Sequence, residues 1–368
     1  MGIDQEVIPG VAKIAVLRPN SLGDFIFSEP ALRAVRNAYP RAEIVYLGLE
    51  WHVAYLPNRF PAVDRVEVVP VSEGVFWEPG MEINPEEQEE FFRRMQAEEF
   101  DLAIQLFGGG RFSNPFTRRL GACFAVGAKD EDAIPLDRWT PYQYYQHEVL
   151  RNLEVVSLVG ARTEFIEPQV PVLEGDLAEA EPVIERLTKP FVVIHPGASS
   201  VRRRWPAAYF AQVADAIVQK LDMQVVLTGV AWEEETVRQV EQEMEQEAVN
   251  LCGQLTLPGF TAFLSQAGLV ITNNTGPLHL ALAVGTPAIG LFFAEHVITT
   301  LPLFRRNFQP LISWNRHCPD CGKYCDKAEL DNRAAYPCQH LVSFLEEIQP
   351  EQVFQEARRF LEAQVLLP

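Results

Sequence analysis

Short apolar runs alternate along the chain with longer segments in which apolar residues recur every three or four positions. In the first half, the apolar runs predict strands at residues 13–18, 43–47, 65–69, 102–106 and 123–126. The amphipathic segments between them predict helices at residues 25–39, 86–98 and 144–158. Strands that alternate with helices in this way form a parallel sheet covered on both faces.

A stretch rich in Pro and Glu, about residues 164–190, separates this pattern from a second one of the same kind. The second pattern predicts strands at residues 191–195, 224–227, 250–251, 269–272 and 288–292. Its predicted helices are residues 209–221, 233–245, 261–266 and 278–284. We therefore predict an α/β protein with two Rossmann-like, doubly wound domains, residues 1–175 and 176–345, that face each other across a cleft. A last amphipathic helix, within residues 346–368, could cross back to pack on the first domain.

One turn in the second half carries the strongest chemical signal. The strand that ends at Thr272 is followed by Asn273-Asn274-Thr275-Gly276-Pro277, and an apolar helix then begins with Leu278-His279. Free backbone N–H groups at such a helix start can hold a phosphate, and His279, one turn in, can face the same crevice. A purely structural explanation is that Asn274 and Thr275 cap the helix, with Pro277 in its first turn.

A second turn of similar build follows the first predicted strand. Residues 13–18 end on the basic Arg18, and Pro19-Asn20-Ser21-Leu22-Gly23-Asp24 leads into an amphipathic helix. Ser21 and Asp24 also fit a capping box, which would explain Asp24 structurally. Two such turns, one in each half, favour ligand sites at the carboxyl ends of both sheets.

Composition and charge narrow the class of ligand. The 368 residues suffice for two domains, and 48% apolar residues indicate a globular protein. A net charge of −19 argues against a general nucleic-acid binder and against broad adhesion to anionic membranes. An anionic ligand therefore needs a local basic patch, either Arg202-Arg203-Arg204 or Arg111 with Arg118 and Arg119, although such runs are as often solvated surface.

Several signals are missing from the sequence. It contains neither G-x-G-x-x-G nor a Walker A motif, which argues against a nicotinamide enzyme or a P-loop ATPase. The N-terminus does not resemble a signal peptide, and the apolar run 280–294 is too short for a membrane span. We therefore expect a cytoplasmic protein that at most rests on a membrane surface, such as the inner face of the inner membrane.

The motifs together resemble family 9 glycosyltransferases, the heptosyltransferase group that builds the inner core of lipopolysaccharide. The resemblance covers most of the chain, and its blocks occur in the order and spacing of the family. The blocks are Ile14 to Asp24 with Pro30-Ala31-Leu32, Phe100 to Ile104 with Arg118 to Ala122, His195 to Ser200 with Arg203 to Pro206, and Asn273 to His279.

This resemblance implies the GT-B architecture and an inverting, metal-independent transfer from a nucleotide-activated sugar, typically ADP-heptose. It places the acceptor in the N-terminal domain and the donor in the C-terminal domain. Asp24 matches the proposed general base, and Arg203 or Arg204 matches a cationic position near the donor phosphates. Asn274, Thr275, Gly276 and His279 match the donor loop. Ser21, Gly23 and Arg111 are expected on the acceptor side, where residues 72–95 and 108–117 would form variable walls.

The residue types suit this chemistry. Inversion needs a carboxylate that accepts the proton of the attacking hydroxyl group. The leaving diphosphate needs hydrogen-bond donors already aimed at it, here Arg side chains, the Ser199 and Ser200 hydroxyls and a helix N-terminus. One of Glu233, Glu234 and Glu235 could bind ribose hydroxyls, whereas the other two are expected to form only the acidic first turn of a helix.

One position departs from the family pattern. The family usually has Asp where this chain has Asn274, so a negative charge near the diphosphate is missing. The change could alter donor preference or weaken the enzyme. A non-catalytic sugar-nucleotide binder or scaffold, and another enzyme of the same architecture such as a sugar-nucleotide epimerase, therefore stay as alternatives.

Four of the six cysteines lie close together in the sequence. Cys318, Cys321, Cys325 and Cys338 form a C-x2-C-x3-C-x12-C pattern, with His317 and His340 beside them. Clustered cysteines in a cytosolic protein favour a metal over disulfides, and the first pair has zinc-knuckle spacing. Structural zinc, free thiols or disulfides, and an iron–sulfur cluster stay open, and none of them is required for sugar transfer. The acceptor, the sugar, the nucleotide and the oligomeric state also stay open.

Overall fold

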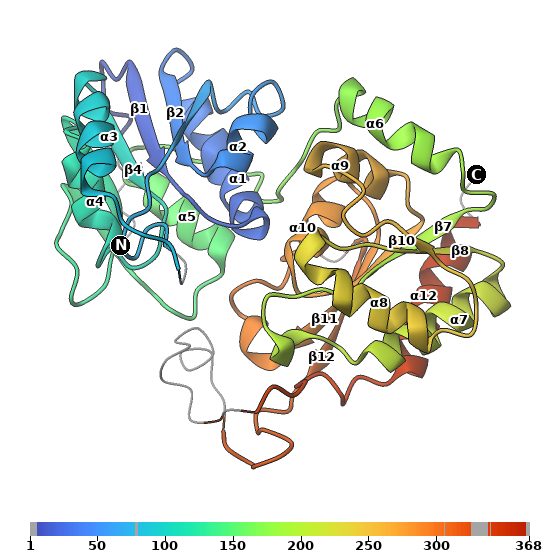
Figure 1. Ribbon diagram of the computed structural model, residues 1–368. Coiled ribbons are helices and arrows are strands. Elements are labelled where there is room, and N and C mark those ends of the chain that lie inside the picture. Colours follow the sequence, from blue (N-terminus) through green and yellow to red (C-terminus); the bar gives the residue numbers. More distant parts are fainter. Residues whose placement is uncertain (1–5, 78–79, 305, 325–337, 339, 366–368) are drawn as a thin grey trace. The chain divides into compact units, whose positions relative to one another are not determined.

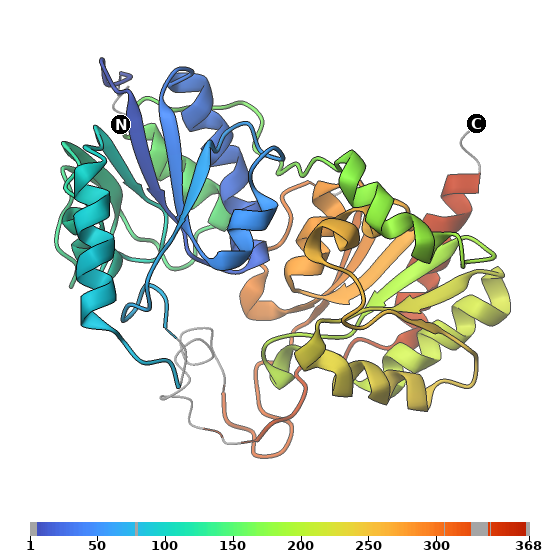
Figure 2. The same cartoon turned by 45° about the horizontal axis from the view of Figure 1, so that its top comes forward.

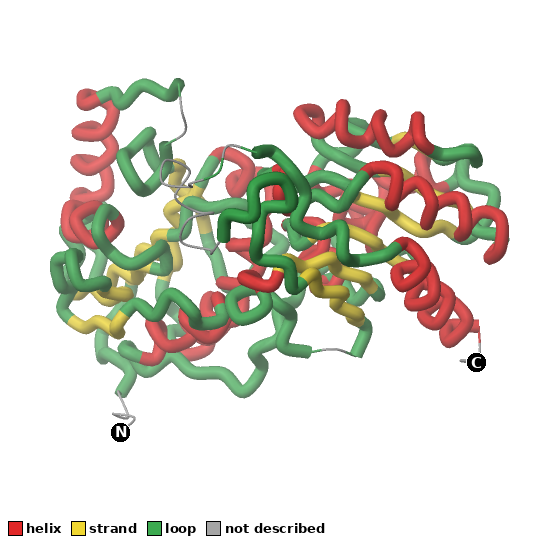
Figure 3. The backbone as a smooth tube through the Cα atoms, turned by 90° about the horizontal axis from the view of Figure 1, so that it is seen from below, coloured by secondary structure: helices red, strands yellow, loops and turns green. Residues whose placement is uncertain are grey.

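The computed structural model describes residues 6–77, 80–304, 306–324, 338 and 340–365. The chain divides into two compact units, Met1–Pro171 and Val172–Pro368. This division lies a few residues before the boundary expected at residues 175 and 176. Each unit has its own sheet with helices on both faces (Figures 1 and 3).

The first unit is built on a six-stranded sheet of order β3-β2-β1-β4-β5-β6, in which all neighbouring pairs are parallel. The central strand β1 is almost wholly buried, as expected for a strand covered on both faces. Its elements are β1 (Lys13–Leu17), α1 (Leu22–Ala38), β2 (Glu43–Gly48), α2 (Glu50–Tyr55), β3 (Arg65–Val68), α3 (Pro85–Ala97), β4 (Leu102–Gln105), α4 (Ser113–Arg119), β5 (Phe124–Lys129), β6 (Arg138–Pro141) and α5 (Glu148–Ser157).

Helices of the first unit form two layers. On one face α1 packs against α5, and Phe25 of α1 contacts the rings of Trp51 and His52 in α2. On the other face Phe91 and Phe92 of α3 pack on Phe116 of α4. The packing of α1 on α5 brings together the first turns of these two helices, which carry the acidic side chains Asp24 and Glu148.

The second unit repeats the design with the strand order β12-β11-β10-β7-β8-β9, again parallel throughout. Its elements are α6 (Glu174–Ile184), β7 (Phe191–His195), η1 (Val201–Arg203), α7 (Ala207–Leu221), β8 (Gln224–Leu227), η2 (Ala231–Glu233), α8 (Glu234–Glu243), β9 (Val249–Asn250), α9 (Leu257–Ser265), β10 (Leu269–Asn273), α10 (Gly276–Ala283), β11 (Ala288–Phe293), η3 (Ala294–His296), β12 (Phe308–Ser313) and α12 (Pro350–Val365).

The last helix belongs to the second unit. α12 packs against α7 and contacts β10 and β11 (Figures 1 and 2). Its side chains Val353 and Ala357 are fully buried in the core of this unit. The apolar face of this helix is thus used within the second unit, and its packing on the first domain stays a prediction.

Some elements differ from the sequence-based prediction. Residues 108–117, expected to be a loop wall, include most of α4, and the segment 164–190, expected to be a boundary, includes α6. The strands β6 and β12 were not predicted. No helix in the described part of the chain is both long and apolar enough to cross a bilayer.

Candidate active site

The first unit reverses its winding beside β1, which pairs with β2 on one side and β4 on the other. In doubly wound sheets, ligands bind at the carboxyl ends of the strands at such a switch point. Arg18 directly follows β1, and its Nη1 donates to the backbone oxygen of Leu106, which directly follows β4. The Arg18 side chain thus spans the switch point itself.

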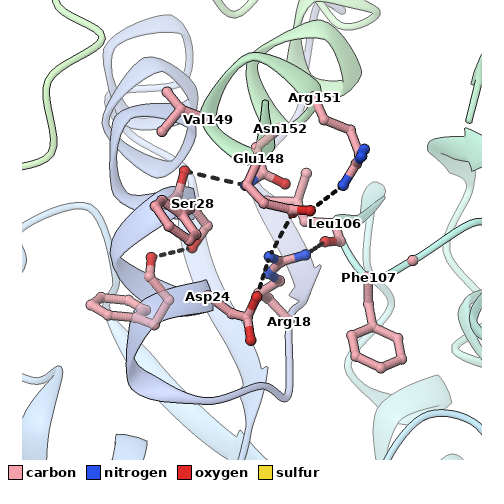
Figure 4. A network of polar contacts seen from close by, with 12 residues as sticks. Arg18, Asp24, Ser28, Leu106, Phe107, Glu148, Val149, Arg151 and Asn152 are labelled. Atoms are coloured by element: carbon pink, nitrogen blue, oxygen red, sulfur yellow. Dashed lines mark hydrogen bonds and ion pairs between the residues drawn. The ribbon is translucent and has the colours of Figure 1, made fainter. Parts of the chain in front are cut away.

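Arg18 is the centre of a polar network (Figure 4). Its side chain is 3% exposed, and its Nη2 lies 3.4 Å from Asp24 Oδ1 and 3.3 Å from Glu148 Oε2. Glu148, in the first turn of α5, also pairs with Arg151. Burial would lower the pKa of Arg18, but the Asp24 and Glu148 carboxylates outweigh burial and raise it. Arg18 therefore stays charged, and two carboxylates share its charge.

Asp24 is the most accessible member of this network. Its side chain is 33% exposed, and Ser21 Oγ donates to its Oδ2 at 2.7 Å. Ser21 occupies the N-cap position of α1 but makes no side-chain capping bond, so the capping-box explanation of Asp24 is wrong. Instead Ser21 and Arg18 orient the carboxylate, which can accept a proton from a hydroxyl group that reaches its exposed edge.

Of the other residues expected on the acceptor side, Gly23 is buried in the first turn of α1. Arg111 is exposed, and its Nη1 lies 3.4 Å from Asp132 Oδ2. Arg118 and Arg119 form ion pairs with Asp137 and Glu89. The second basic patch thus consists of surface arginines that already have acidic partners.

In the second unit, β7 and β10 are the central neighbours, and His195 pairs in register with Thr272. The turns that follow these strands therefore meet at one end of the sheet. Asn273 joins them: its Oδ1 accepts the Trp205 N–H at 3.0 Å, and its Nδ2 donates to the Pro196 oxygen at 2.8 Å. This buried amide fixes the position of both turns, a role that the sequence motif alone did not identify.

Asn274 belongs to a second buried network. Its Oδ1 lies 3.1 Å from His279 Nε2, and its Nδ2 lies 3.2 Å from His296 Nδ1 and 2.9 Å from Thr300 Oγ1. His279 therefore lies beside the turn, as the sequence predicted, but its described bond is to Asn274. The side chains of Asn274 and His279 are both largely buried.

Thr275 and Gly276 begin α10. Thr275 is the N-cap residue and makes no side-chain capping bond; its Oγ1 lies 3.4 Å from Thr272 Oγ1. Pro277 lies in the first turn, as predicted. Neither Asn274 nor Thr275 is therefore a conventional cap. Pro277 has no N–H group and the Leu278 N–H donates to the Thr275 oxygen at 3.1 Å, so a phosphate at this helix start would use the Gly276 N–H.

The basic triplet follows β7, and its members differ in their contacts. Arg204 Nε donates to the Ala198 oxygen at 2.8 Å and its Nη1 to Thr236 Oγ1 at 3.1 Å. Arg203 Nη2 donates to Ser199 Oγ. Arg202 turns to another segment and donates to the backbone oxygens of Cys338 and His340, both at 2.9 Å. Arg203 and Ser199 thus come together as expected, with Ser200 at the N-cap of η1.

Glu233 differs from its two acidic neighbours. It is 4% exposed, its Oε2 lies 3.4 Å from His195 Nε2, and it accepts the Val230 N–H at 3.0 Å. Burial would raise the pKa of Glu233, but the hydrogen bond and charge of His195, the Val230 N–H and Arg204 together lower it. Glu234 and Glu235 form the acidic first turn of α8, as expected for two of the three.

The described members of the cysteine cluster converge. Cys318, Cys321 and Cys338 and the His340 ring place their ligand atoms within 4.8 Å of one another. Cys325 lies outside the described residues. His340 takes part in the cluster, whereas the sequence pattern had favoured four cysteines. Of the two cysteines outside this cluster, Cys123 is exposed and Cys252 is half-buried.

Sequence reasoning missed Arg18 and Glu148 as members of the site. A charged residue directly after a buried strand was the available signal for Arg18. Glu148 had no local signal, because it lies 130 residues from its partner.

Comparisons with known proteins agree with this arrangement. The family model Glycosyltransferase family 9 (heptosyltransferase) matches residues 89–329. The lipopolysaccharide heptosyltransferase 1 of Pseudomonas aeruginosa is 26% identical over 295 residues, which cover 76% of this chain and 78% of that protein.

Two solved structures share the fold. A family 9 glycosyl transferase from Veillonella parvula is 21% identical with a TM-score of 0.75, covering 96% of this chain and 97% of its own. ADP-heptose lps heptosyltransferase II of E. coli is 19% identical with a TM-score of 0.72, covering 96% and 99%. The two α/β units thus have the GT-B architecture, and the chain belongs to glycosyltransferase family 9 as a heptosyltransferase-like glycosyltransferase.

Proposed function

We propose that the protein transfers a sugar, heptose from ADP-heptose, to a lipopolysaccharide or other surface-glycan acceptor, with inversion and without a divalent metal. The observation that carries this proposal is the Asp24 carboxylate, which Arg18 and Ser21 hold at the carboxyl end of β1 with a third of its side chain exposed. Such a carboxylate is placed and oriented as a general base requires.

The comparisons support the donor and acceptor classes. Three relatives that each match more than half of this chain carry the names lipopolysaccharide or lipooligosaccharide heptosyltransferase. E. coli heptosyltransferase WaaC, 17% identical with a TM-score of 0.62, was solved with ADP. A lipid-linked acceptor would bring the protein to the cytoplasmic face of the inner membrane as a peripheral protein.

In the proposed reaction, Asp24 accepts the proton of the acceptor hydroxyl as its oxygen attacks the anomeric carbon. The new glycosidic bond forms as the bond from that carbon to the diphosphate oxygen breaks, so the configuration inverts in one displacement. The nucleoside diphosphate leaves with the bonding electrons. Donors aimed at the growing charge stabilise it without a cation.

The second unit supplies those donors. We assign the diphosphate to Arg203, Arg204, the hydroxyls of Ser199 and Ser200, and the N-terminus of α10 at Thr275 and Gly276. Glu233 is assigned to the ribose end of the donor, and Asn274 with His279 to the packing of the turn behind it.

The experiment separates binding from chemistry. We expect the wild type to bind ADP more tightly than UDP or GDP by calorimetry, equally in EDTA and in Mg²⁺. Asp24→Asn should bind ADP like the wild type while transfer from ADP-heptose falls by roughly 10²–10⁴-fold, because the proton acceptor is lost.

The matched control is Asp132→Asn, which removes an exposed carboxylate of the same unit and should leave transfer unchanged. Turnover above a tenth of wild type in Asp24→Asn would exclude Asp24 as the base. Binding of ADP with no transfer to any acceptor by the wild type would instead support a sugar-nucleotide-binding scaffold, and the neutral Asn274 would be its first explanation.

A further inference from the structure

The cysteine-rich segment after β12 brings four ligand atoms to one point. Cys318 Sγ and Cys321 Sγ each lie 3.4 Å from Cys338 Sγ. His340 Nδ1 lies 3.5 Å from Cys318 Sγ and 3.4 Å from Cys338 Sγ. Cys318 and Cys338 are buried, whereas Cys321 and His340 are exposed, so the cluster lies at the edge of the core.

These distances fit a tetrahedral metal better than the alternatives. A disulfide would bring one pair of sulfurs to about 2.05 Å and would leave the third thiol and the imidazole unused. In a tetrahedron with metal–sulfur bonds of about 2.3 Å, neighbouring sulfurs lie roughly 3.8 Å apart, close to the spacing here. Cys₃His is a common set for structural zinc, and thiolates also bind iron.

The backbone around Cys318 and Cys321 forms a tight turn that holds these two cysteines close together. The Gly322 N–H donates to the Cys318 oxygen at 2.8 Å, and the Cys318 N–H donates to the Lys323 oxygen at 2.8 Å. Gly322 has φ of +68°, in the left-handed region that favours glycine, which closes the turn tightly. The His340 N–H donates to Cys338 Sγ at 3.4 Å, so the backbone also holds these two residues together.

We propose that Cys318, Cys321, Cys338 and His340 bind one thiolate-preferring metal ion, Zn²⁺ or iron, in a tetrahedral site. The ion joins the turn after β12 to the segment that begins at Cys338. Both segments also contribute to the core of the second unit through Cys318 and Cys338. The site is therefore structural, because no ligand position is left open for a substrate.

The second segment lies along the basic triplet. Besides the two bonds that Arg202 makes to the oxygens of Cys338 and His340, the Phe344 N–H donates to the Arg202 oxygen at 3.0 Å. Ser343 Oγ donates to the Arg204 oxygen at 2.6 Å, and Trp205 Nε1 donates to the Ile348 oxygen at 2.9 Å. By fixing this second segment, the metal would also stabilise the backbone of residues 202–205, which carries the Arg203 and Arg204 side chains.

A second consequence rests on the proposed function. If Arg203 and Arg204 bind the donor diphosphate, loss of the metal loosens their support and weakens nucleotide binding. Metal content and nucleotide affinity are separate measurements, so failure of one proposal can be told from failure of the other.

The first test is the elemental composition of the purified full-length protein by plasma mass spectrometry. We expect about one Zn or Fe per chain, and a fall to near zero in Cys321→Ser, since loss of one ligand opens the tetrahedron. Cys252→Ser is the matched control and should keep the metal. A wild type with no metal after growth with both metals, or a Cys321→Ser variant with full metal content, would overturn the site.

A histidine pair tests the fourth ligand. His340→Ala should lose the metal during dialysis against a chelator that leaves the wild type loaded, whereas His317→Ala should behave like the wild type. Retention of the metal in His340→Ala would show that the ligand set is wrong. Circular dichroism of each variant identifies any that fails to fold, in which case Cys321→Ser decides.

Nucleotide affinity is the last readout. ADP should bind Cys321→Ser at least about tenfold more weakly than Cys252→Ser, a loss in the range seen when the support of a binding site is removed. Equal ADP affinity of the two variants would contradict the inferred support of Arg203 and Arg204 by the metal, but it would not contradict the metal site. Absence of ADP binding in the metal-loaded wild type would count against the proposed function, not against the metal site.

Discussion

His52 is a neutral histidine buried next to the Arg18 network. Its side chain is inaccessible to solvent, its Nδ1 accepts the Leu49 N–H at 2.9 Å, and its ring stacks on Trp51. Its Nε2 lies 3.5 Å from the hydroxyl of Tyr46, which donates to the Arg18 oxygen. Burial lowers the pKa of His52 to about 3, so the folded protein keeps this ring uncharged.

This burial predicts how stability depends on pH. Below the ordinary pKa of 6.5, the unfolded chain gains a proton on His52 while the folded protein does not until about pH 3. The free energy of unfolding should therefore be unaffected by His52 above pH 6.5 and fall by up to about 1.4 kcal/mol per pH unit below it. Urea unfolding at a series of pH values measures the slope.

His52→Gln, which keeps an acceptor for the Leu49 N–H, should flatten this pH dependence even if it is less stable at pH 7. The exposed His317→Gln should leave the slope as in the wild type. Parallel curves for the wild type and His52→Gln between pH 6.5 and 4 would contradict the prediction.

Asn274 is a second residue at which a single side-chain atom decides the hydrogen bonding, because its amide nitrogen replaces an oxygen of the aspartate that the family usually has. Its Nδ2 faces two acceptors, His296 Nδ1 and Thr300 Oγ1, while its Oδ1 faces His279 Nε2. An aspartate in this place would have no N–H to offer, so His296 would have to carry a proton on Nδ1. The amide therefore offers both a donor and an acceptor to this network without burying a charge.

At the scale of elements, the loops after β7 and β8 are fitted to each other at Gly197 and Glu233. A Cβ added to Gly197 would lie 2.0 Å from Glu233 Oε1, a distance that no packing allows. Glu233 is held in place by His195 and Val230, so it cannot move away without breaking those contacts. The glycine is therefore required by the close approach of the carboxylate.

We expect Gly197→Ala to lower the free energy of unfolding by roughly 1–3 kcal/mol through this overpacking, and to weaken ADP binding. Glu233→Ala removes the obstructing carboxylate. In the double variant, the additional cost of Gly197→Ala should therefore nearly vanish, which is a coupling that a double-mutant cycle measures. Additive effects of the two substitutions would show that the contact does not limit residue 197. The matched control is Gly175→Ala, where an added Cβ meets nothing within 4 Å.

The sequence predicted central elements better than peripheral ones. The strands next to β1 and β10 are apolar runs and were found, because strands buried on both faces have a clear pattern. β6 and β12 are edge strands that contain Pro141 and Pro310, and proline argues against a strand unless it lies at an edge. α6 contains Pro182 and was hidden in an acidic segment for the same reason.

The candidate site shows a similar limit. Turns after central strands were visible in the sequence, and with them Asp24, Arg203 and Asn274. Their partners were not, because Glu148, His296 and His340 reach the site only through the tertiary fold. Asn273 was visible in the motif, but its bonds to both turns depend on β7 and β10 being neighbours.

At the scale of the whole molecule, each unit carries a core of its own. One cluster contains β1, β2 and α3 side chains such as Val45, and another contains β7, α7 and α12 side chains such as Val213. Separate cores favour separate unfolding transitions for the two units. The proposed donor-binding residues all belong to the second unit, since each follows β7, β8 or β10.

A saturating donor nucleotide should therefore stabilise one transition and not the other. At ADP concentrations about 100 times Kd, the linkage adds about 2.7 kcal/mol to the unit that binds it. For a unit of this size that is a rise of roughly 5–10 °C in Tm, which differential scanning calorimetry resolves.

Val45→Ala and Val213→Ala, both at buried core positions, assign the two transitions, because each lowers the Tm of its own unit. ADP should raise the transition that Val213→Ala lowers and leave the Tm of the other transition unchanged to within about 1 °C. If ADP instead raises the transition that Val45→Ala lowers, the donor assignment to the second unit is wrong, whatever the fate of Asp24 as the base.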